Sequence, residues 1–242
     1  MKSGLLIAAA ALVLAAGCTP TAPPAQDTAT EAQVAAPVAI TAPAGEYKLD
    51  KGHASLLFSV THMGLSNYTL RFTDFDATLN FDPANVAAST VSATINPASI
   101  ESDYVGDYRA THQGSPYRSW DEELQKDEKF LNVAANPTIT FQSTGITVTG
   151  ERTGTMTGNL TFLGQTHPVT LDVTFNGEAQ PPWLGGRSAV GFSATGSFDR
   201  SQFGMTHLVP NISDAVQLTL EVEFQQVAAP AAPAAPAAAT TP

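Results

Sequence analysis

Apolar and polar residues alternate with a period of two along most of this chain, which is typical of β-strands with one buried face. The clearest runs are residues 216–224 and 169–175, in which Val, Leu and Phe alternate strictly with polar residues. The same alternation occurs in residues 54–62, 91–95, 139–148, 156–162 and 192–198. These runs predict at least eight strands, each with one apolar and one solvent-exposed face.

The alternation changes phase once, between Leu70-Phe72 and the run that begins at Phe75. One extra residue near Thr73 and Asp74 restores the register, which is the behaviour of a β-bulge in a strongly bent strand. We therefore expect one long strand over this region, with a bulge at its centre.

A single helix is predicted among the strands. Ser119 and Glu122 have the spacing of a capping box, and acidic residues fill the first turn. Trp120, Leu124 and Leu131 lie on one face of this helix, so we expect it to pack against the sheet. Many short strands with one apolar face must form two packed sheets or close into a barrel.

Low-complexity segments on both sides limit the folded domain to residues 45–227. Residues 18–44 are rich in Ala, Pro and Thr, and residues 228–242 form an uncharged Ala-Pro tract. Neither segment has enough apolar surface to offset the entropy of ordering, so we expect both to be unstructured.

The N-terminus has the features of an export signal. Lys2 precedes an apolar run, residues 5–16, that is too short to span a bilayer. The only cysteine of the 242 residues, Cys18, follows Ala15-Ala16-Gly17 directly, which resembles a bacterial lipobox. We therefore expect residues 1–17 to be a lipoprotein signal peptide and Cys18 to be acylated. The resemblance places the protein in the cell envelope, on the periplasmic side and at the outer membrane.

Charge and motifs exclude several functional classes. The formal net charge is -11 without a Lys/Arg cluster, which is unfavourable for nucleic acid. No nucleophile elbow, zinc-binding HExxH helix, P-loop or EF-hand loop is present. The five histidines lack the spacing of most metal sites, so we predict neither a metal nor a catalytic centre. Among the histidines, His62 differs because it continues the apolar positions of its strand, so its ring is expected to point inward near one end. It is either a rim histidine or a contact for a ligand's polar end.

Several short motifs, in their order along the chain, resemble the YceI-like domain of bacterial polyisoprenoid-binding proteins. They are Tyr47-Lys48-Leu49-Asp50 with His53; Phe58-Ser59-Val60-Thr61-His62-Met63-Gly64; Phe130-Leu131-Asn132 with Asn136-Pro137-Thr138-Ile139; Gly158-Asn159-Leu160-Thr161-Phe162-Leu163-Gly164 with His167-Pro168-Val169; and Gly191-Phe192 with Asp199-Arg200-Ser201-Gln202-Phe203-Gly204-Met205. The resemblance implies an all-β fold, an extended eight-stranded antiparallel lipocalin-like barrel with a short side helix. It also implies an elongated apolar cavity that holds an isoprenoid chain.

In each predicted strand, the apolar positions of the alternation are expected to point inward and to line such a cavity. They are Phe58, Val60, His62, Phe72, Leu79, Ile139, Phe141, Leu160, Phe162, Leu171, Val173, Phe175, Phe192, Phe198, Leu218, Leu220 and Val222. Large residues alternate with Ala and Gly on these faces, which fits an open tunnel and a filled core equally.

The resulting functional hypothesis is a binding protein, without cofactor, for a quinone or polyprenyl lipid that it stores or transports in the envelope. Its expected partners are this lipid and the membrane, and the sequence leaves a homodimer open. Two alternatives stand beside it: a filled barrel with a structural or stress role, and a small metal-dependent barrel enzyme. A second histidine or a carboxylate near His62 would favour the enzyme, and the absence of a continuous cavity would favour the filled barrel.

Overall fold

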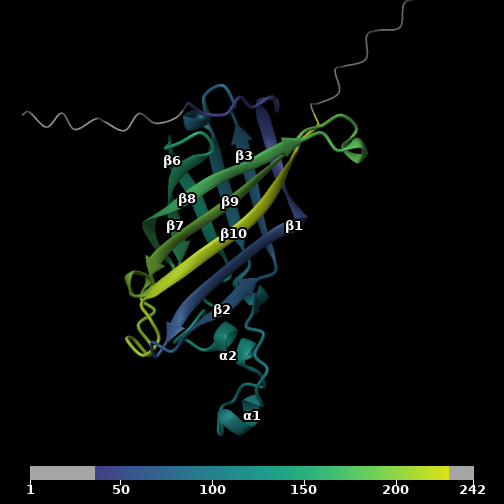
Figure 1. Cartoon of the computed structure of the whole chain (residues 1–242). Coiled ribbons are helices and arrows are strands. Elements are labelled where there is room, and N and C mark those ends of the chain that lie inside the picture. Colours follow the sequence, from purple (N-terminus) through teal and green to yellow (C-terminus); the bar gives the residue numbers. More distant parts are fainter. Residues whose placement is uncertain (1–35, 229–242) are drawn as a thin grey trace, which may run out of the picture. The chain divides into compact units, whose positions relative to one another are not determined.

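The computed structural model describes residues 36–228, which form a barrel of antiparallel strands (Figure 1). The predicted signal segment, Cys18, the first part of the predicted linker and the Ala-Pro tail beyond Ala228 lie outside the described residues. The strands are β1 (Gly45–His62), β2 (Ser66–Phe72), β3 (Phe75–Phe81), β4 (Thr90–Ile95), β5 (Ile100–Glu101), β6 (Ile139–Val148), β7 (Thr153–Phe162), β8 (Gln165–Ala179), β9 (Ala189–Asp199) and β10 (Ala215–Gln226). The helices are α1 (Tyr108–Thr111) and α2 (Trp120–Lys126), and short 3-10 turns lie at η1 (Val86–Ala88), η2 (Pro97–Ser99), η3 (Pro182–Leu184) and η4 (Arg200–Phe203).

The barrel closes because β1 pairs with β10 on one side and with β2 and β3 on the other. β2 and β3 occupy one barrel position in succession, and β4 and β5 occupy the next. The remaining order is β6, β7, β8, β9 and β10, each antiparallel to its neighbour. The prediction of a closed, eight-stranded antiparallel barrel is therefore confirmed.

The phase change after Phe72 is a break between two strands. β2 ends at Phe72 and β3 begins at Phe75, so two residues leave the ladder where one bulged residue was expected. The Thr73 amide donates to the Ser99 carbonyl oxygen (3.1 Å), and the Asp74 amide donates to the Ser99 hydroxyl (3.0 Å). The bend is thus supported by hydrogen bonds from the neighbouring turn, η2.

β1 is longer than the alternation predicted, because the strand already begins at Gly45. Its register against β10 shifts between Leu49 and Ala54. The intervening residues, Asp50 to His53, are polar or glycine, and they hide the alternation of the first half. The bulge divides a strand of 18 residues into two halves that pair with β3 and β2 in turn.

The predicted helix is present as α2. The Ser119 hydroxyl accepts a hydrogen bond from the Glu122 amide (3.1 Å), as an N-cap residue does. The helix ends at Lys126, so Leu131 lies beyond it and not on its face. No helix among the described residues has both the length and the hydropathy needed to cross a membrane.

The barrel has two different ends. At one end, here called the linker end, lie residue 36, residue 228 and the turns β3–β4, β6–β7 and β8–β9 (Figure 1). At the other end, called the helix end, lie the β1–β2 turn, the β9–β10 loop, α1 and α2. Buried apolar residues form one cluster toward each end, the first around Phe203 and Leu124 and the second around Tyr47 and Val190.

Candidate ligand cavity

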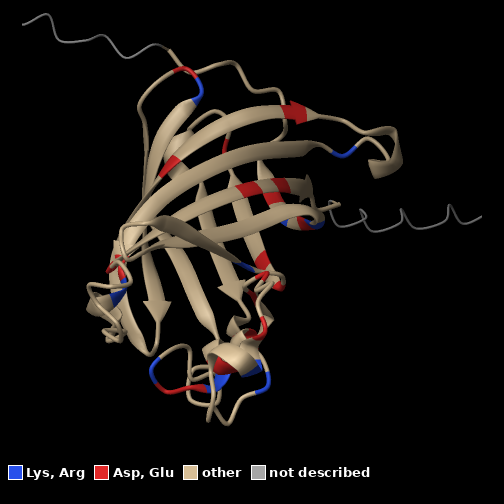
Figure 2. Cartoon of the chain, turned by 60° about the horizontal axis from the view of Figure 1, so that its bottom comes forward, with Lys and Arg blue, Asp and Glu red and all other residues tan. Residues whose placement is uncertain are grey.

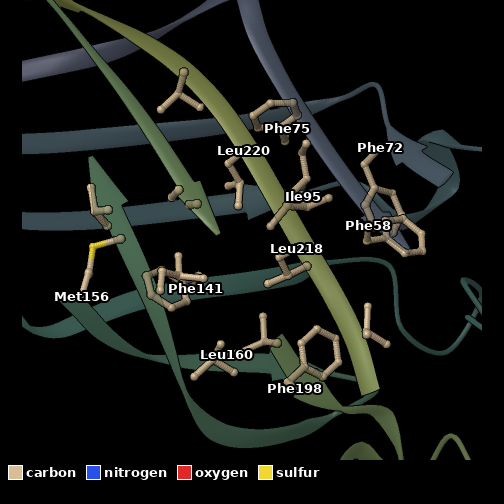
Figure 3. A pocket seen from close by; sticks show the side chains of 18 of the residues that line it. Phe58, Phe72, Phe75, Ile95, Phe141, Met156, Leu160, Phe198, Leu218 and Leu220 are labelled. Carbon is tan, nitrogen blue, oxygen red and sulfur yellow. The ribbon is translucent and has the colours of Figure 1, made fainter. Parts of the chain in front are cut away.

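A continuous cavity of about 730 Å³ runs through the barrel between the two clusters. This volume is in the range of sites that hold one small organic ligand. The wall is almost entirely apolar, with contributions from all the long barrel strands (Figure 3). The filled-barrel alternative, which required the absence of such a cavity, is not favoured by this structure.

The residues that the alternation assigned to the interior all lie on the cavity wall. They are Phe58, Val60 and His62 of β1; Phe72 and Leu79 of β2 and β3; Ile139 and Phe141 of β6; Leu160 and Phe162 of β7; Leu171, Val173 and Phe175 of β8; Phe192 and Phe198 of β9; and Leu218, Leu220 and Val222 of β10. The rings of Phe58 and Phe72 stack at a centroid distance of 5.0 Å (Figure 3).

Two glycines on the inward faces do not provide open space. A Cβ atom at Gly196 would lie 2.6 Å from Leu171 Cδ2 and 2.8 Å from the Thr170 carbonyl oxygen. At Gly158 it would lie 2.7 Å from the Gln142 carbonyl oxygen. Glycine at these positions lets neighbouring strands and large side chains approach closely, so the free volume lies elsewhere in the barrel.

The linker end is partly covered by residues 37–43, here called the strap. Pro37, Val38 and Ile40 lie on the cavity wall, and Ala42 is only 3% exposed. The prediction that the unstructured linker extends to Ala44 was therefore wrong for its last residues. The average composition of the segment concealed two large apolar side chains that the barrel buries in part.

One carboxylate fastens the strap to β8. Glu178 accepts hydrogen bonds from the Thr41 amide (2.8 Å), the Thr41 hydroxyl (2.6 Å) and the Ala42 amide (2.7 Å). Partial burial opposes the charged form, but these hydrogen bonds outweigh it and hold the pKa of Glu178 below its usual value. The Tyr47 hydroxyl donates to the Pro43 carbonyl oxygen (2.7 Å) and fixes the end of the strap.

The helix end carries most of the uncharged polar and aromatic groups of the wall. His62, Ser66, Tyr68, Tyr104 and His112 line the cavity there. His62 is exposed, which places it at the rim of the barrel. Among residues 36–228, the His62 ring has no hydrogen-bond partner and no carboxylate within ion-pair distance. In the described part of the chain, the carboxylate partner that would have favoured an enzyme is thus not found beside His62.

The position of His112 at the cavity was not predicted from the sequence. Its ring stacks on Tyr108 at a centroid distance of 4.5 Å and on Trp120 at 5.4 Å, and it borders the cavity. Trp120 also lines the cavity, although its helix was expected only to pack on the sheet. The segment between β5 and β6 carries no alternation, so its position across the barrel end was not predictable from periodicity.

Arg200 is a buried cation on the wall whose hydrogen bonds are already used. Its guanidinium donates to the carbonyl oxygens of Ser213 (2.9 Å), His207 (2.8 Å), Ile212 (3.0 Å) and Met205 (3.3 Å). The side chain is 4% exposed, and burial lowers its pKa from the usual value. Arg200 therefore organises the β9–β10 loop and has little capacity left for an anionic ligand.

A group with metal-ligand geometry lies outside the cavity. Asp50, His53 and Glu223 offer ligand atoms within 4.8 Å of one another. His53 Nδ1 is 2.9 Å from Asp50 Oδ2, and Gln225 Nε2 donates to the same oxygen (2.6 Å). The hydrogen bond with His53 lowers the pKa of Asp50, and the same contact raises the pKa of His53. These contacts describe a surface ion pair at the β1 bulge, and none of the three residues lies on the cavity wall.

Comparison with known proteins agrees with this architecture. Residues 47–224 match the YceI-like domain. The chain belongs to the YceI-like family. A UPF0312 protein of Ectopseudomonas mendocina is 37% identical over 182 residues, which are 74% of this chain and 87% of that protein. Protein YceI of Salmonella arizonae is 37% identical over 185 residues, 76% of this chain and 88% of that protein. The crystal structure of a Campylobacter jejuni YceI protein shares 27% identity and a TM-score of 0.57, covering 69% of this chain and 90% of that one.

The resemblance found in the short motifs is thus confirmed. The motif Asp199 to Met205 contains Arg200, whose side chain organises the β9–β10 loop, and Gly158 allows the close packing of β6 and β7. Some motif residues therefore have structural tasks in this barrel, whereas others, such as Phe58, Leu160 and Phe162, lie on the cavity wall.

Proposed function

We propose that this protein binds a long isoprenoid lipid of the quinone or polyprenyl type in the barrel cavity, by physical binding without a catalytic step. The observation that carries the proposal is the continuous apolar cavity, partly covered by the strap at one end and lined with polar groups at the other. Burial of an apolar chain stabilises a complex by about 25 cal/mol per Å², so a long tail supplies most of the affinity.

The polar end of the cavity favours a neutral head group. The buried cation there, Arg200, is already satisfied by backbone carbonyl oxygens, so a carboxylate or phosphate lacks a free cationic partner on this part of the wall. Tyr104, Tyr68 and the His112 ring, which stacks on Tyr108 and Trp120, instead offer aromatic and hydrogen-bonding groups. A quinone ring combines a planar π-system with carbonyl acceptors and matches these groups.

Burial keeps Tyr68 in its neutral form. Burial is the main cause that raises the pKa of Tyr68, whose hydroxyl donates to the Ser102 carbonyl oxygen (3.1 Å). A neutral phenol at the wall favours a neutral ligand over an anion, because no charge is present to be neutralised.

The proposed setting is the cell envelope. The apolar run of residues 5–16 and the single cysteine at Cys18 support export and acylation, with the protein held on the periplasmic side of the outer membrane. An anchored binding protein of this kind would store an isoprenoid lipid or carry it between membrane sites. The membrane and the lipid are then its partners.

Mass spectrometry of organic extracts from the purified protein tests the proposal directly. We expect an isoprenoid lipid in the extract, near one molecule per barrel, and saturable binding of a long-chain ubiquinone by the delipidated protein. An extract without isoprenoid, together with no saturable binding of ubiquinone or polyprenol, would reject the proposed function.

A further inference from the structure

Two loops at the helix end form an apolar surface patch beside the cavity. Met63, Leu65, Leu208 and Val209 are 61%, 81%, 46% and 38% exposed, respectively. The first two belong to the β1–β2 turn and the others to the β9–β10 loop. These four residues are called the loop patch below.

Hydrogen bonds join the two loops into one surface. The Met63 amide donates to the Asn211 carbonyl oxygen (2.6 Å), and the Ser213 amide donates to the Thr61 carbonyl oxygen (2.9 Å). The Arg200 guanidinium donates hydrogen bonds to four carbonyl oxygens of the β9–β10 loop. The exposed apolar side chains are therefore presented by a well-organised framework.

The loop patch is continuous with the cavity wall. Leu208 is 46% exposed and also lines the cavity, and so do its neighbours Ile212, His62 and Ser66. A side chain that faces both solvent and cavity marks a place where the cavity approaches the surface. An apolar molecule leaving the cavity here would meet apolar side chains first.

The loop patch also differs from the rest of the surface in charge. Residues 62–68 and 201–213 contain no Asp, Glu, Lys or Arg, although the chain has a net charge of -11. Charged residues of the helix end gather around α1 and α2, and Asp199, Arg200 and Asp214 flank the β9–β10 loop without belonging to the loop patch (Figure 2). An exposed apolar area without charge suits the uncharged interior of a bilayer, and a negatively charged protein gains nothing from anionic lipids.

We infer that the loop patch inserts into a lipid bilayer and that an isoprenoid enters the cavity beside it. The inference of a bilayer contact rests on three observations: the four side chains of the loop patch are exposed, the patch carries no charged residue, and it lies beside the cavity. The loading role rests on the proposed function. Contact at the cavity mouth lets a lipid pass from the membrane into the barrel without crossing water.

A fluorescent reporter tests the bilayer contact without any ligand. In a Cys18→Ser background, a single cysteine is placed at Leu65 or, as the control, at Trp183, which is 80% exposed at the linker end. Each cysteine carries a polarity-sensitive dye, and phosphatidylcholine vesicles are added. We expect a blue shift of the emission for Leu65→Cys and none for Trp183→Cys.

Three outcomes would overturn the inference about the bilayer. They are no shift for Leu65→Cys, an equal shift for Trp183→Cys, and a shift at position 65 that follows protein concentration without vesicles. The last would show that a second copy of the chain covers the loop patch.

A second measurement tests whether the isoprenoid passes from the membrane into the barrel beside the loop patch. The Met63→Asn, Leu65→Ser variant removes apolar surface, and Asn suits the positive φ of 51° at position 63. From phosphatidylcholine vesicles that contain ubiquinone, we expect uptake to slow by about tenfold relative to the parent and to Trp183→Ser, because two exposed apolar contacts are lost. The dissociation constant for ubiquinone supplied in detergent should be the same in all three proteins, since neither position 63 nor 65 lines the cavity.

The two measurements separate the two proposals. Equal uptake rates would reject the loading role while leaving ligand binding intact. If the parent binds neither ubiquinone nor polyprenol from detergent and its extract contains no isoprenoid, the proposed function and the loading role both fail, and the dye at position 65 still decides whether the loop patch enters a bilayer.

Discussion

Filling the cavity at Ala194 should weaken ligand binding while leaving the barrel folded. Ala194 lies on the cavity wall, between Val173 of β8 and Leu220 of β10, and is 8% exposed. Ala194→Trp directs an indole into the cavity of about 730 Å³. Thr195→Trp is the matched control, because Thr195 is the next residue of the same strand and is exposed on the outer face.

The expected loss follows from the surface that the indole takes from the ligand. An aromatic side chain buries about 150–250 Å². If about 100 Å² of this replaces contact with the ligand, about 2.5 kcal/mol of binding free energy is lost, at about 25 cal/mol per Å². This loss corresponds to a dissociation constant roughly 70-fold higher. The free energy of unfolding should change by less than about 1 kcal/mol, because the indole enters free volume and does not overpack a full core.

Titration of delipidated protein with a long-chain ubiquinone, alongside urea unfolding, gives both quantities. Equal dissociation constants for Ala194→Trp and Thr195→Trp would refute binding inside the barrel. A loss of about 3 kcal/mol of stability in Ala194→Trp, without a change in affinity, would show that this part of the interior is solid. Gly196 is a poor site for the same test, because any side chain there meets the Thr170 backbone.

Three further predictions concern stability and the N-terminus. Leu171→Asp, which places a carboxyl on the apolar wall, should reduce the unfolding free energy by about 3 kcal/mol or more in urea unfolding, whereas Asp172→Ala on the outer face should change it by less than about 0.5 kcal/mol. Because the folded-state pKa of Glu178 is lowered, its contribution to holding the strap is complete above the unfolded pKa of about 4.3 and is lost as the pH falls through the folded value. The hydrogen-exchange protection factors of Thr41 and Ala42 should therefore fall in acid, and in Glu178→Gln, which has no titrating carboxyl, they should not depend on pH in this range. Intact-mass analysis of the protein from membranes should show an acylated Cys18 as the first residue, and a Met1 or unmodified Cys18 terminus would contradict the lipoprotein hypothesis.

The fold was largely predictable because most barrel strands have one solvent-exposed face and one face toward the interior. Alternation then marks both the strand and its inward residues, as in residues 216–224 of β10. The first half of β1 was hidden, because the polar residues of the bulge at Asp50 to His53 interrupt the pattern. The break after Phe72 was located by the phase change, but periodicity alone does not distinguish a bulge from two strands.

The ends of the cavity were much less predictable than its wall. The strap depends on Val38 and Ile40 within an Ala-Pro-Thr segment, and its fastening depends on Glu178, which is remote in sequence. The stack of Tyr108, His112 and Trp120 involves a segment without periodicity. Such features arise from contacts between loops, and no local pattern in the sequence encodes them.

The positions of the strap and the loop patch constrain how an anchored barrel would meet its membrane. In the proposed lipoprotein, residues 18–37 would be the tether between Cys18 and the linker end, and a chain of 20 residues spans at most about 70 Å. β1, with 18 residues, runs from the linker end to the helix end over about 60 Å of strand. The tether is thus long enough to return along the barrel, so the loop patch can reach the same membrane that holds the acyl chains. Had the strap been part of the barrel's fixed wall over many more residues, the tether would have been too short for this. If Cys18 is acylated as proposed, a spacer of this length would therefore allow lipid loading from the anchoring membrane without release of Cys18.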